Sequence, residues 1–261
     1  MENFFDFLES ADLFSPGIIA ILVGVGFVVG FVNTVAGMAT AITYALFMAM
    51  GMPINIANGT TRVGVFAQFL VTSLIFKREG YLNLGTGVRV GIPVAAGALF
   101  GAELVAILSP AIIETAMGFL LPVMTLLLFL QRPTNNPVMK QFAPWKYFVF
   151  FLIGLYGGFT HAGVGLLIIF GSYFMLGMDM LHANGIKQFA VVIYTPIALA
   201  IFILYGQVNW PVALIYGVGN ILGGVAGSYA SIKGGVKIIK ISVALAVLTM
   251  SGWLLYKNLI A

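Results

Sequence analysis

The chain has 261 residues, of which 61% are hydrophobic and only 8% are charged, and its mean hydropathy is +1.08. So few polar side chains exclude a water-soluble globule and predict an all-α polytopic membrane protein. The net charge is +4, but the basic residues lie in short loops and at segment ends rather than in a patch with interleaved aromatic residues. This distribution predicts contact with membrane lipid and excludes nucleic acid as a partner.

Apolar runs follow one another along the first part of the chain, at about 17–34, 37–50, 60–76, 86–108 and 111–130. The second run, at roughly 14 residues, is too short to cross the hydrocarbon core upright, because a helix needs about 20 residues to do so. We expect it to form a broken or re-entrant helical hairpin with the run before it, followed by three full transmembrane helices. Backbone that leaves helical geometry at membrane depth must be buried or line a polar cavity, so the break marks a cavity or a tight helix contact.

The second part of the chain repeats the first with a constant spacing. Ala57-Asn58-Gly59 recurs as Ala183-Asn184-Gly185, and 183 − 57 is 126. The same offset places a second set of apolar runs at about 145–160, 163–176, 188–205, 211–232 and 237–256.

Matches under this offset concentrate on Gly, Asn and Thr, whereas chance apolar similarity would match Leu, Val and Ile. They indicate a repeated backbone device. We therefore predict two homologous transmembrane repeats, at residues 1–131 and 147–261, joined by a linker at 132–146. Residues 1–14 are expected to be an interfacial segment.

Positive charge favours an inverted orientation of the two halves. Three groups of basic residues would all be cytoplasmic if each half reversed direction an odd number of times, which places both termini outside. The groups are Lys77, Arg78 and Arg89; Arg132, Lys140 and Lys146; and Lys233, Lys237 and Lys240. The prediction is thus a multi-pass protein of the plasma (inner) membrane with inverted-topology repeats.

The first repeat carries the run Asn33-Thr34-Val35-Ala36-Gly37, then Gly51-Met52-Pro53, then Ala57-Asn58-Gly59-Thr60-Thr61-Arg62. This pattern resembles the repeat of the TauE/SafE family of sulfite and organosulfonate permeases. The resemblance covers both halves and implies a polytopic plasma-membrane carrier that moves small anions, often sulfur oxyanions or sulfonates.

The residues themselves point to the same chemistry. We expect a helix to begin at Asn58, with Gly59 allowing close approach and the free amides of Thr60 and Thr61 facing outward, because such a terminus attracts anions. Arg62 adds a charged fork suited to an oxyanion. The second half repeats this device, and two inverted helix starts would then clasp one anion at the midplane. Its residues are Asn184, Gly185, Lys187 and Gln188.

Further residues near the breaks are predicted to line the same site. They are Asn33, Thr34, Gly37, Thr160, His161 and Gly163. Gly37 and Gly163 fit close helix packing as well as lining, and the two threonines can instead bond a helical carbonyl. His161 fits a proton relay, an anion donor or a structural hydrogen-bonded histidine.

Several of the polar positions also have simpler interpretations. Arg62 and Lys187 can be interfacial cations that extend to lipid headgroups, and the Asn-Gly pairs can be structural caps. Glu103 lies near the end of a span and fits an interfacial position. The offset pairs Gln68 with Tyr194, which we expect to be secondary lining residues.

A secondary transporter that works by alternating access between the repeats accounts for the duplication, the breaks and the cations together. Sulfite, thiosulfate or organosulfonates are the expected substrates; small carboxylates, or an anion channel, are the alternatives. The chain has no HExxH, GxSxG or GxxxxGK[ST] run and no Cys, so no enzyme, cofactor or nucleotide-driven pump is expected. Two His cannot form a multi-His metal site. A homo-oligomer is compatible with the sequence.

Overall fold

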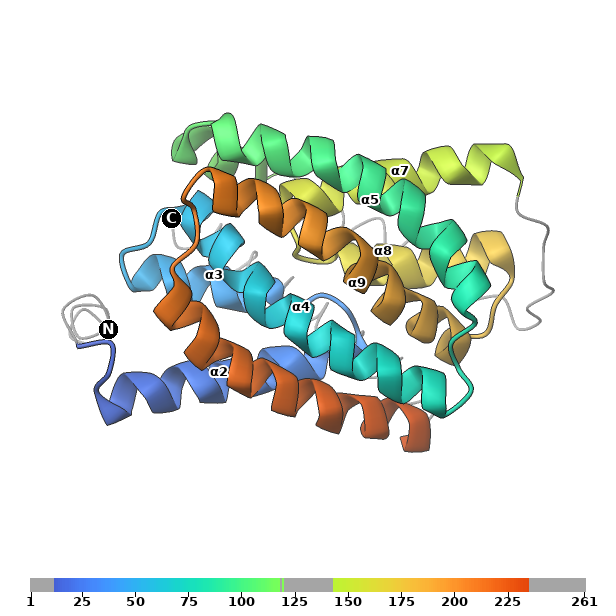
Figure 1. The fold of residues 1–261 in the computed structure, drawn as a ribbon, viewed down its shortest axis with the longest axis horizontal. Coiled ribbons are helices and arrows are strands. Elements are labelled where there is room, and N and C mark those ends of the chain that lie inside the picture. The colour runs from blue at the N-terminus through green and yellow to red at the C-terminus, as the bar shows by residue number, and fades with distance from the viewer. Residues whose placement is uncertain (1–11, 118, 120–142, 235–261) are drawn as a thin grey trace, which may run out of the picture.

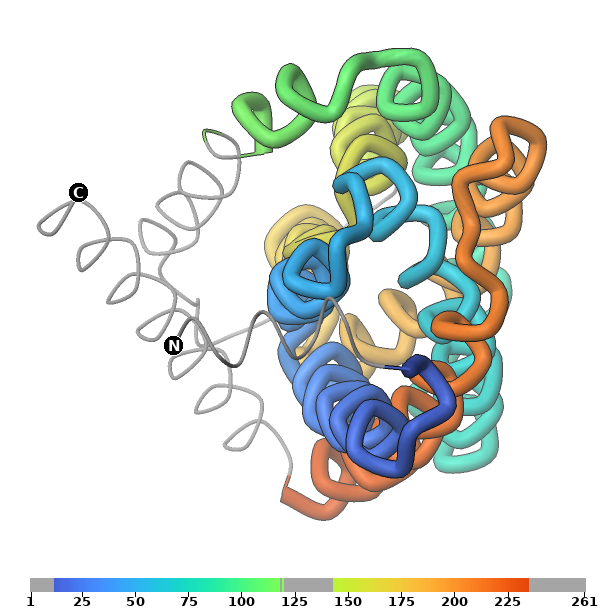
Figure 2. The backbone as a smooth tube through the Cα atoms, turned by 90° about the vertical axis from the view of Figure 1, so that its left-hand side faces the viewer, coloured from blue at the N-terminus to red at the C-terminus, as the bar shows by residue number. Residues whose placement is uncertain are grey.

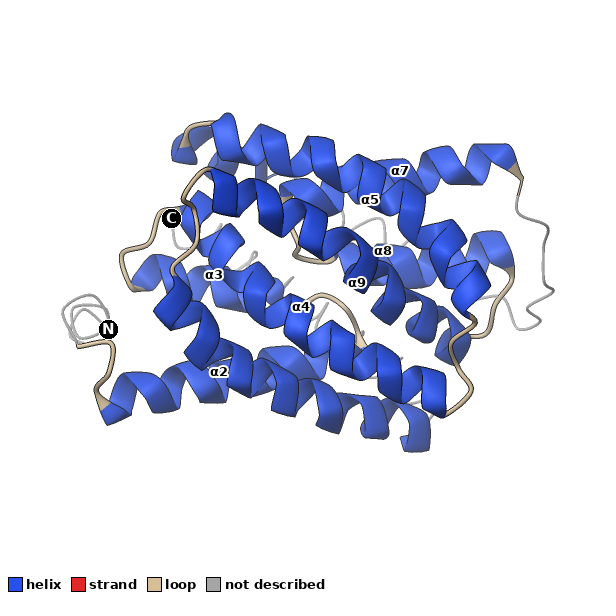
Figure 3. Cartoon of the chain, in the orientation of Figure 1, coloured by secondary structure: helices blue, strands red, loops and turns tan. Residues whose placement is uncertain are grey.

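The computed structural model describes residues 12–117, 119 and 143–234, and every regular element in these ranges is helical (Figure 3). The expected runs at 237–256 and most of 111–130, together with most of the linker at 132–146 and of segment 1–14, lie outside the described residues. The elements in chain order are α2 (Pro16–Val35), α3 (Thr40–Ala49), α4 (Ile54–Arg78), α5 (Leu84–Ile107), a helix that begins at residue 110, α7 (Pro144–Phe159), α8 (Val164–Phe170), the π-helix η1 (Gly171–Met175), α9 (Met180–Leu204) and helix Trp210–Gly234.

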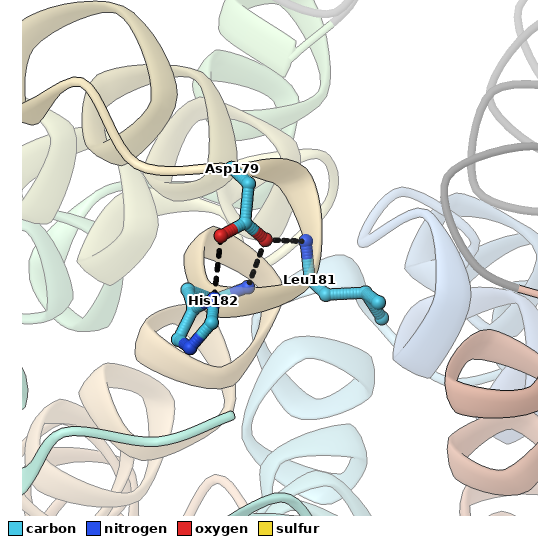
Figure 4. Close-up of polar contacts among 3 residues, drawn as sticks. All are labelled: Asp179, Leu181 and His182. Carbon is cyan, nitrogen blue, oxygen red and sulfur yellow. Dashed lines mark hydrogen bonds and ion pairs between the residues drawn. The ribbon is translucent and has the colours of Figure 1, made fainter. Parts of the chain in front are cut away.

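Local side-chain caps explain where several helices begin. Ser15 accepts a hydrogen bond from the amide of Ile18 at the start of α2, and Asn83 caps α5. Asp179 caps α9 by accepting from the amides of Leu181 and His182, at 3.0 and 3.1 Å (Figure 4). These caps satisfy amides that have no partner within the helix.

Five of the described helices are long and apolar enough to cross a membrane, which agrees with the predicted membrane protein. They are α2, α4, α5, α9 and Trp210–Gly234. The second element of each half is short, as predicted: α3 has 10 residues, and α8 with η1 covers Val164–Met175. The first element of the first half is longer than a short-helix hairpin requires, because the 20 residues of α2 reach the length of a full span.

The 126-residue offset is visible in the backbone. Helices α4 and α9 both have 25 residues, and their first residues, 54 and 180, and last residues, 78 and 204, differ by that offset. In the described ranges, the glycines with positive φ also fall into three pairs with this spacing. The pairs are Gly37 and Gly163, Gly51 and Gly177, and Gly80 and Gly206. Each half therefore bends its chain at matching positions with the residue that tolerates this conformation.

The two halves pack crosswise. Helix α5 of the first half lies on α7 of the second, and helix Trp210–Gly234 of the second half lies on α2 of the first (Figure 2). The contacts are so close that a methyl group on Gly97 or Gly158 would overlap the facing backbone of α7 or α5. Gly30 and Gly223 make the matching contacts between α2 and Trp210–Gly234. Small residues let helix backbones approach in this way.

The core of the molecule is formed by α4 and α9, which contact each other, and by the two breaks (Figure 1). Helix α4 ends on the right of Figure 1, where α5 begins, whereas α9 begins on that side and ends on the left. The breaks between α2 and α3 and between α7 and α8 lie midway along the bundle rather than at its ends. Polar side chains at these breaks are therefore held in the interior.

Candidate functional site

Arg62 of α4 is completely buried and reaches from the first half into the second. Its Nη2 donates to the carbonyl oxygens of Gly157 and Gly158, at 3.1 and 2.6 Å, and its guanidinium carbon lies 5.0 Å from the ring centre of Phe202. Those carbonyls belong to the last turn of α7, where the helix has no partner for them and carries partial negative charge. Arg62 thus caps the end of a helix from the opposite half.

Lys187 of α9 makes the reciprocal contact. It is also fully buried, and its Nζ donates to the carbonyl oxygens of Asn33 and Thr34, both at 2.7 Å. These carbonyls belong to the last turn of α2. The ammonium group also lies 5.4 Å from the ring centre of Phe69, a first-half residue. Each half therefore contributes one cation that binds carbonyls in the last turn of a helix of the other half.

The expectation that Asn58 and Asn184 begin helices is wrong. Helix α4 begins at Ile54 after Pro53, and α9 begins at Met180 after the cap Asp179, so both asparagines lie inside a helix. The backbone amides that follow them are within helical turns. A cluster of free amides at Asn58 to Arg62 is thus not available, and the positive charge of the site comes from side chains alone.

The interpretation of Arg62 and Lys187 as cations that extend to headgroups is also wrong, because both have 0% exposure. A cation that reached the lipid–water boundary would keep its charged end exposed.

The repeated glycine of the Asn-Gly pair allows a crosswise backbone contact. A Cβ on Gly59 would overlap the carbonyl oxygen of Gln207, and one on Gly185 would overlap that of Tyr81. Positions 81 and 207 are themselves related by the offset. Each glycine therefore accommodates the turn that precedes a long helix of the other half, which is a packing role.

Asn58 links Arg62 to the second break. Its Oδ1 accepts from Arg62 Nε and from the hydroxyl of Tyr44, both at 3.1 Å, while its Nδ2 donates to the carbonyl oxygen of Phe159 at 2.9 Å. The backbone amide of His161 in turn donates to the Tyr44 hydroxyl at 3.1 Å. Tyr44 was absent from the predicted site, although a tyrosine in the apolar run 37–50 was a signal that could have identified it.

Asn184 and Gln188 form a similar group around the first break. Gln188 Nε2 donates to Asn184 Oδ1 and to the carbonyl oxygen of Thr34, both at 3.1 Å. Its Oε1 accepts from the hydroxyl of Thr72 at 2.9 Å. The side chains of these residues are all fully buried: Thr34, Thr72, Asn184 and Gln188. The structure thus brings Asn184, Lys187 and Gln188 together at the end of α2.

The first break packs against the start of α8. Gly37 packs on Gly165, since a Cβ on either would come within 2.8 Å of the other's backbone. Gly163 is uncrowded, and the nearest atom to its Cβ would be the Tyr156 hydroxyl, at 3.6 Å. Asn33 stabilises the first break by accepting from the Ala39 amide and donating to the Thr40 hydroxyl.

Gln68 and Tyr194, which the offset pairs, each bond to the break of their own half. Gln68 Nε2 donates to Thr34 Oγ1 at 2.8 Å. The Tyr194 hydroxyl lies 2.6 Å from His161 Nδ1. His161 has 3% exposure, and Val35 takes its place in the first half. The second half therefore has a titratable side chain where the first half has an apolar one.

Three further predicted threonines are bonded to main-chain groups. Thr60 Oγ1 accepts from the Asn209 amide, Thr61 Oγ1 donates to the Ala57 carbonyl within α4, and Thr160 Oγ1 accepts from the Ala162 amide. Thr34 accepts from Gln68 rather than bonding back to a helical carbonyl.

Charge in the described interior is one-sided. Arg62, Lys187 and Lys146 are buried, whereas none of the Asp and Glu residues in the described ranges is. Glu103 is partly exposed and accepts from the Tyr205 hydroxyl at 2.6 Å, in line with an interfacial position. The described residues contain no group of three His, Cys, Asp or Glu that could hold a metal ion. The arrangement can therefore accommodate negative charge near the breaks.

Comparison with known proteins identifies related chains. The family model described as "Sulfite exporter TauE/SafE" matches residues 22–254. A probable membrane transporter protein, ORF9, from a Sinorhizobium species is 30% identical over 88% of this chain and 91% of its own length. A probable membrane transporter protein of Haemophilus influenzae is 26% identical over 92% and 95%. The probable membrane transporter protein YfcA of Escherichia coli K12 is 24% identical over 99% and 96%.

No solved structure gives a significant match. The family match extends through both repeats and includes Arg62 and Lys187. The chain belongs to the TauE/SafE family of membrane transporters.

Proposed function

We propose that the protein is a secondary transporter of small anions in the plasma membrane, with sulfite, thiosulfate or organosulfonates as its substrates. The observation that carries the proposal is the pair of fully buried cations, Arg62 and Lys187, in a described interior without a buried carboxylate. Burying an uncompensated charge costs several kcal/mol. A bound anion would offset that cost.

The helix ends offset only part of this charge. A helix C-terminus carries roughly half a negative elementary charge, so each cation keeps roughly half a positive charge after it caps α2 or α7. Together the two sites retain about one positive charge. A small anion between them would complete the compensation.

Unpartnered donors support the same site. Arg62 Nη1 and Asn184 Nδ2 are buried and have no hydrogen-bond partner among the described residues. Buried donors normally have a partner, so these two atoms are suited to a ligand. A guanidinium nitrogen without a partner can donate to an oxygen of a sulfur oxyanion.

Alternating access between inverted repeats fits the backbone. The matched glycines and helix bounds support a structural repeat, and the opposite directions of α4 and α9 in Figure 1 support its inversion. In such transporters the substrate lies near the midplane at the repeat interface. The two breaks, each held by a cation of the other half, occupy that position in this proposal.

Flux through proteoliposomes tests the proposal. Vesicles loaded with unlabelled thiosulfate should take up labelled thiosulfate in counterflow, and uptake should saturate with concentration. Sulfite and methanesulfonate should compete, whereas acetate and succinate should not. Competition by the carboxylates alone would favour the alternative substrate class, and flux without saturation or counterflow would favour an anion channel. Vesicles without protein provide the background.

A further inference from the structure

His161 is the one buried histidine among the described residues. Its Nδ1 lies 2.6 Å from the Tyr194 hydroxyl. Its ring lies edge-on to Phe69, with the ring centres 6.3 Å apart. The imidazole is thus held through Nδ1 by a hydroxyl that can donate or accept.

The charged and titratable groups around His161 come from four elements. Arg62 of α4 and Lys187 of α9 are the two cations bound at the breaks. Tyr194 of α9 bonds its ring, Tyr44 of α3 accepts from its backbone amide, and Tyr156 of α7 bonds the neighbouring Ala162 carbonyl. Among these groups, Arg62 and Lys187 are the basic ones.

Charge balance determines when the histidine can take up a proton. A proton on His161 would add a further positive charge to a site that already retains about one. In the unoccupied site this addition is opposed by the burial of the imidazole and by the charges of Arg62 and Lys187. A bound monoanion balances the existing charge, but a bound dianion leaves about one negative charge in excess, which a protonated imidazole would neutralise.

We propose that His161 binds one proton when the site binds a divalent oxyanion, so that the protein carries a dianion together with a proton. This inference rests on the proposed function and names its coupling ion. The proton comes from the solution on the side where the anion enters and leaves with the anion on the other side. Tyr194 suits this role because a hydroxyl can donate to the neutral ring nitrogen or accept from the protonated one.

The repeat supports a specialised role for this residue. At the matching positions the first half has Val35 and Gln68, neither of which titrates in the physiological range. Gln68 nevertheless bonds its own break through Thr34, so the structural function of the pair does not require a titratable group.

Proton uptake during binding tests the inference directly. Purified protein in weakly buffered detergent solution, with a pH indicator, should take up about one proton per thiosulfate bound and much less per methanesulfonate. His161→Gln, which keeps a hydrogen-bonding side chain but cannot be protonated, should bind thiosulfate more weakly and take up no proton. Tyr156→Phe removes a nearby buried hydroxyl that does not contact the imidazole, so its proton count should match that of the unaltered protein.

Transport provides a second readout. An inward pH gradient, acidic outside, should drive thiosulfate accumulation through the unaltered protein. His161→Gln should lose this accumulation, whereas Tyr156→Phe should keep it. If His161→Gln does not fold, Tyr194→Phe serves instead, and its proton uptake should shift to more acidic pH because the imidazolium loses an acceptor.

Several outcomes would overturn the inference. They are equal proton uptake for the two anions, undiminished uptake in His161→Gln, or an unchanged pH profile in Tyr194→Phe. Thiosulfate binding without any proton would reject proton coupling alone. Absence of thiosulfate binding by the unaltered protein would reject the proposed function, and this inference with it.

Discussion

The ammonium group of Lys187 lies 2.7 Å from the carbonyl oxygen of Asn33, a residue 154 positions earlier in the chain. This contact joins the second half to the broken end of α2, and Arg62 makes the corresponding contact with α7. In the proposed function, an entering anion would share these cations with main-chain carbonyls. Anion binding and the position of the helix ends would then be linked.

Removal of either cation should weaken anion binding. Arg62→Lys keeps the charge but loses the planar fork, so we expect a loss of about 1.5 to 3 kcal/mol in thiosulfate affinity, the value of a hydrogen bond to a charged group. Arg62→Gln should lose more, because the charge also disappears. Lys187→Gln should have a comparable effect, because Lys187 is as deeply buried as Arg62.

Isothermal titration of the purified variants measures these changes. Lys146→Gln is the matched control. Lys146 is a buried cation near the start of α7, away from the breaks, and it donates to the Met175 carbonyl. The substitution should lower stability and leave affinity unchanged. Unaltered affinity in Arg62→Gln would remove the main support for the anion site.

The two break glycines should differ in their tolerance of alanine. Both have φ near +80°, where an L side chain is strained by about 1 to 2 kcal/mol. Gly37→Ala should cost more than Gly163→Ala, because only Gly37 faces backbone at overlapping distance. Gly24→Ala in α2 is the control, since its Cβ would have open space. Thermal unfolding followed by tryptophan fluorescence ranks the three, and equal losses at Gly37 and Gly163 would contradict the packing of the breaks.

Inverted topology predicts which loops share a side of the membrane. Because the chain has no Cys, single cysteines can be introduced without a background. Lys77→Cys and Lys233→Cys should react with an impermeant thiol reagent from the cytoplasmic side, and Ser109→Cys from the opposite side. Labelling of positions 77 and 233 from opposite sides would show that the halves are not inverted.

The cap of α9 should make stability depend on pH in the acid range. Partial burial acts to raise the pKa of Asp179, but the bonds to the His182 amide and ring and to the Leu181 amide outweigh it, so the pKa lies below its usual value. A carboxylate with a lowered folded-state pKa stabilises at neutral pH, and this contribution is lost as pH falls below about 4.

Asp179→Ala should therefore cost about 1 kcal/mol at pH 7, the usual value of an N-cap. Asp179→Asn keeps a cap acceptor and should lose less, with no acid-dependent change from this site. Unfolding curves at pH 7 and in the acid range compare the two. An equal loss in both variants would mean that charge, and not capping, dominates at this helix start.

The repeat and most helix bounds could be predicted because positive φ restricts a position to glycine and leaves a visible spacing. The starts of α4 and α9 were missed although signals were present. Pro53 and Asp179 are typical of helix starts. The prediction instead followed the repeated Asn-Gly pair and placed both helix starts four residues too late. A glycine that accommodates another backbone looks the same in sequence as one that follows a cap.

The partners of the buried cations could not be predicted. Both cations bind main-chain carbonyl oxygens, which every residue possesses. Arg62 binds those of Gly157 and Gly158, and Lys187 binds those of Asn33 and Thr34. Only the fold determines which carbonyls are left unpaired at a helix end and which cation reaches them. The residue types near the breaks indicated an anion site, but its crosswise construction depends on three-dimensional packing.

The contact between α2 and Trp210–Gly234 also has a consequence for biosynthesis. Helix α2 is made early, yet the backbone that covers Gly26 and Gly30 belongs to a helix translated near the end of the described chain. The small-residue face of α2 therefore stays uncovered in the bilayer while most of the protein is synthesised. A nascent chain that stops before Trp210 would keep this face uncovered, which would make it a recognisable target for membrane quality control.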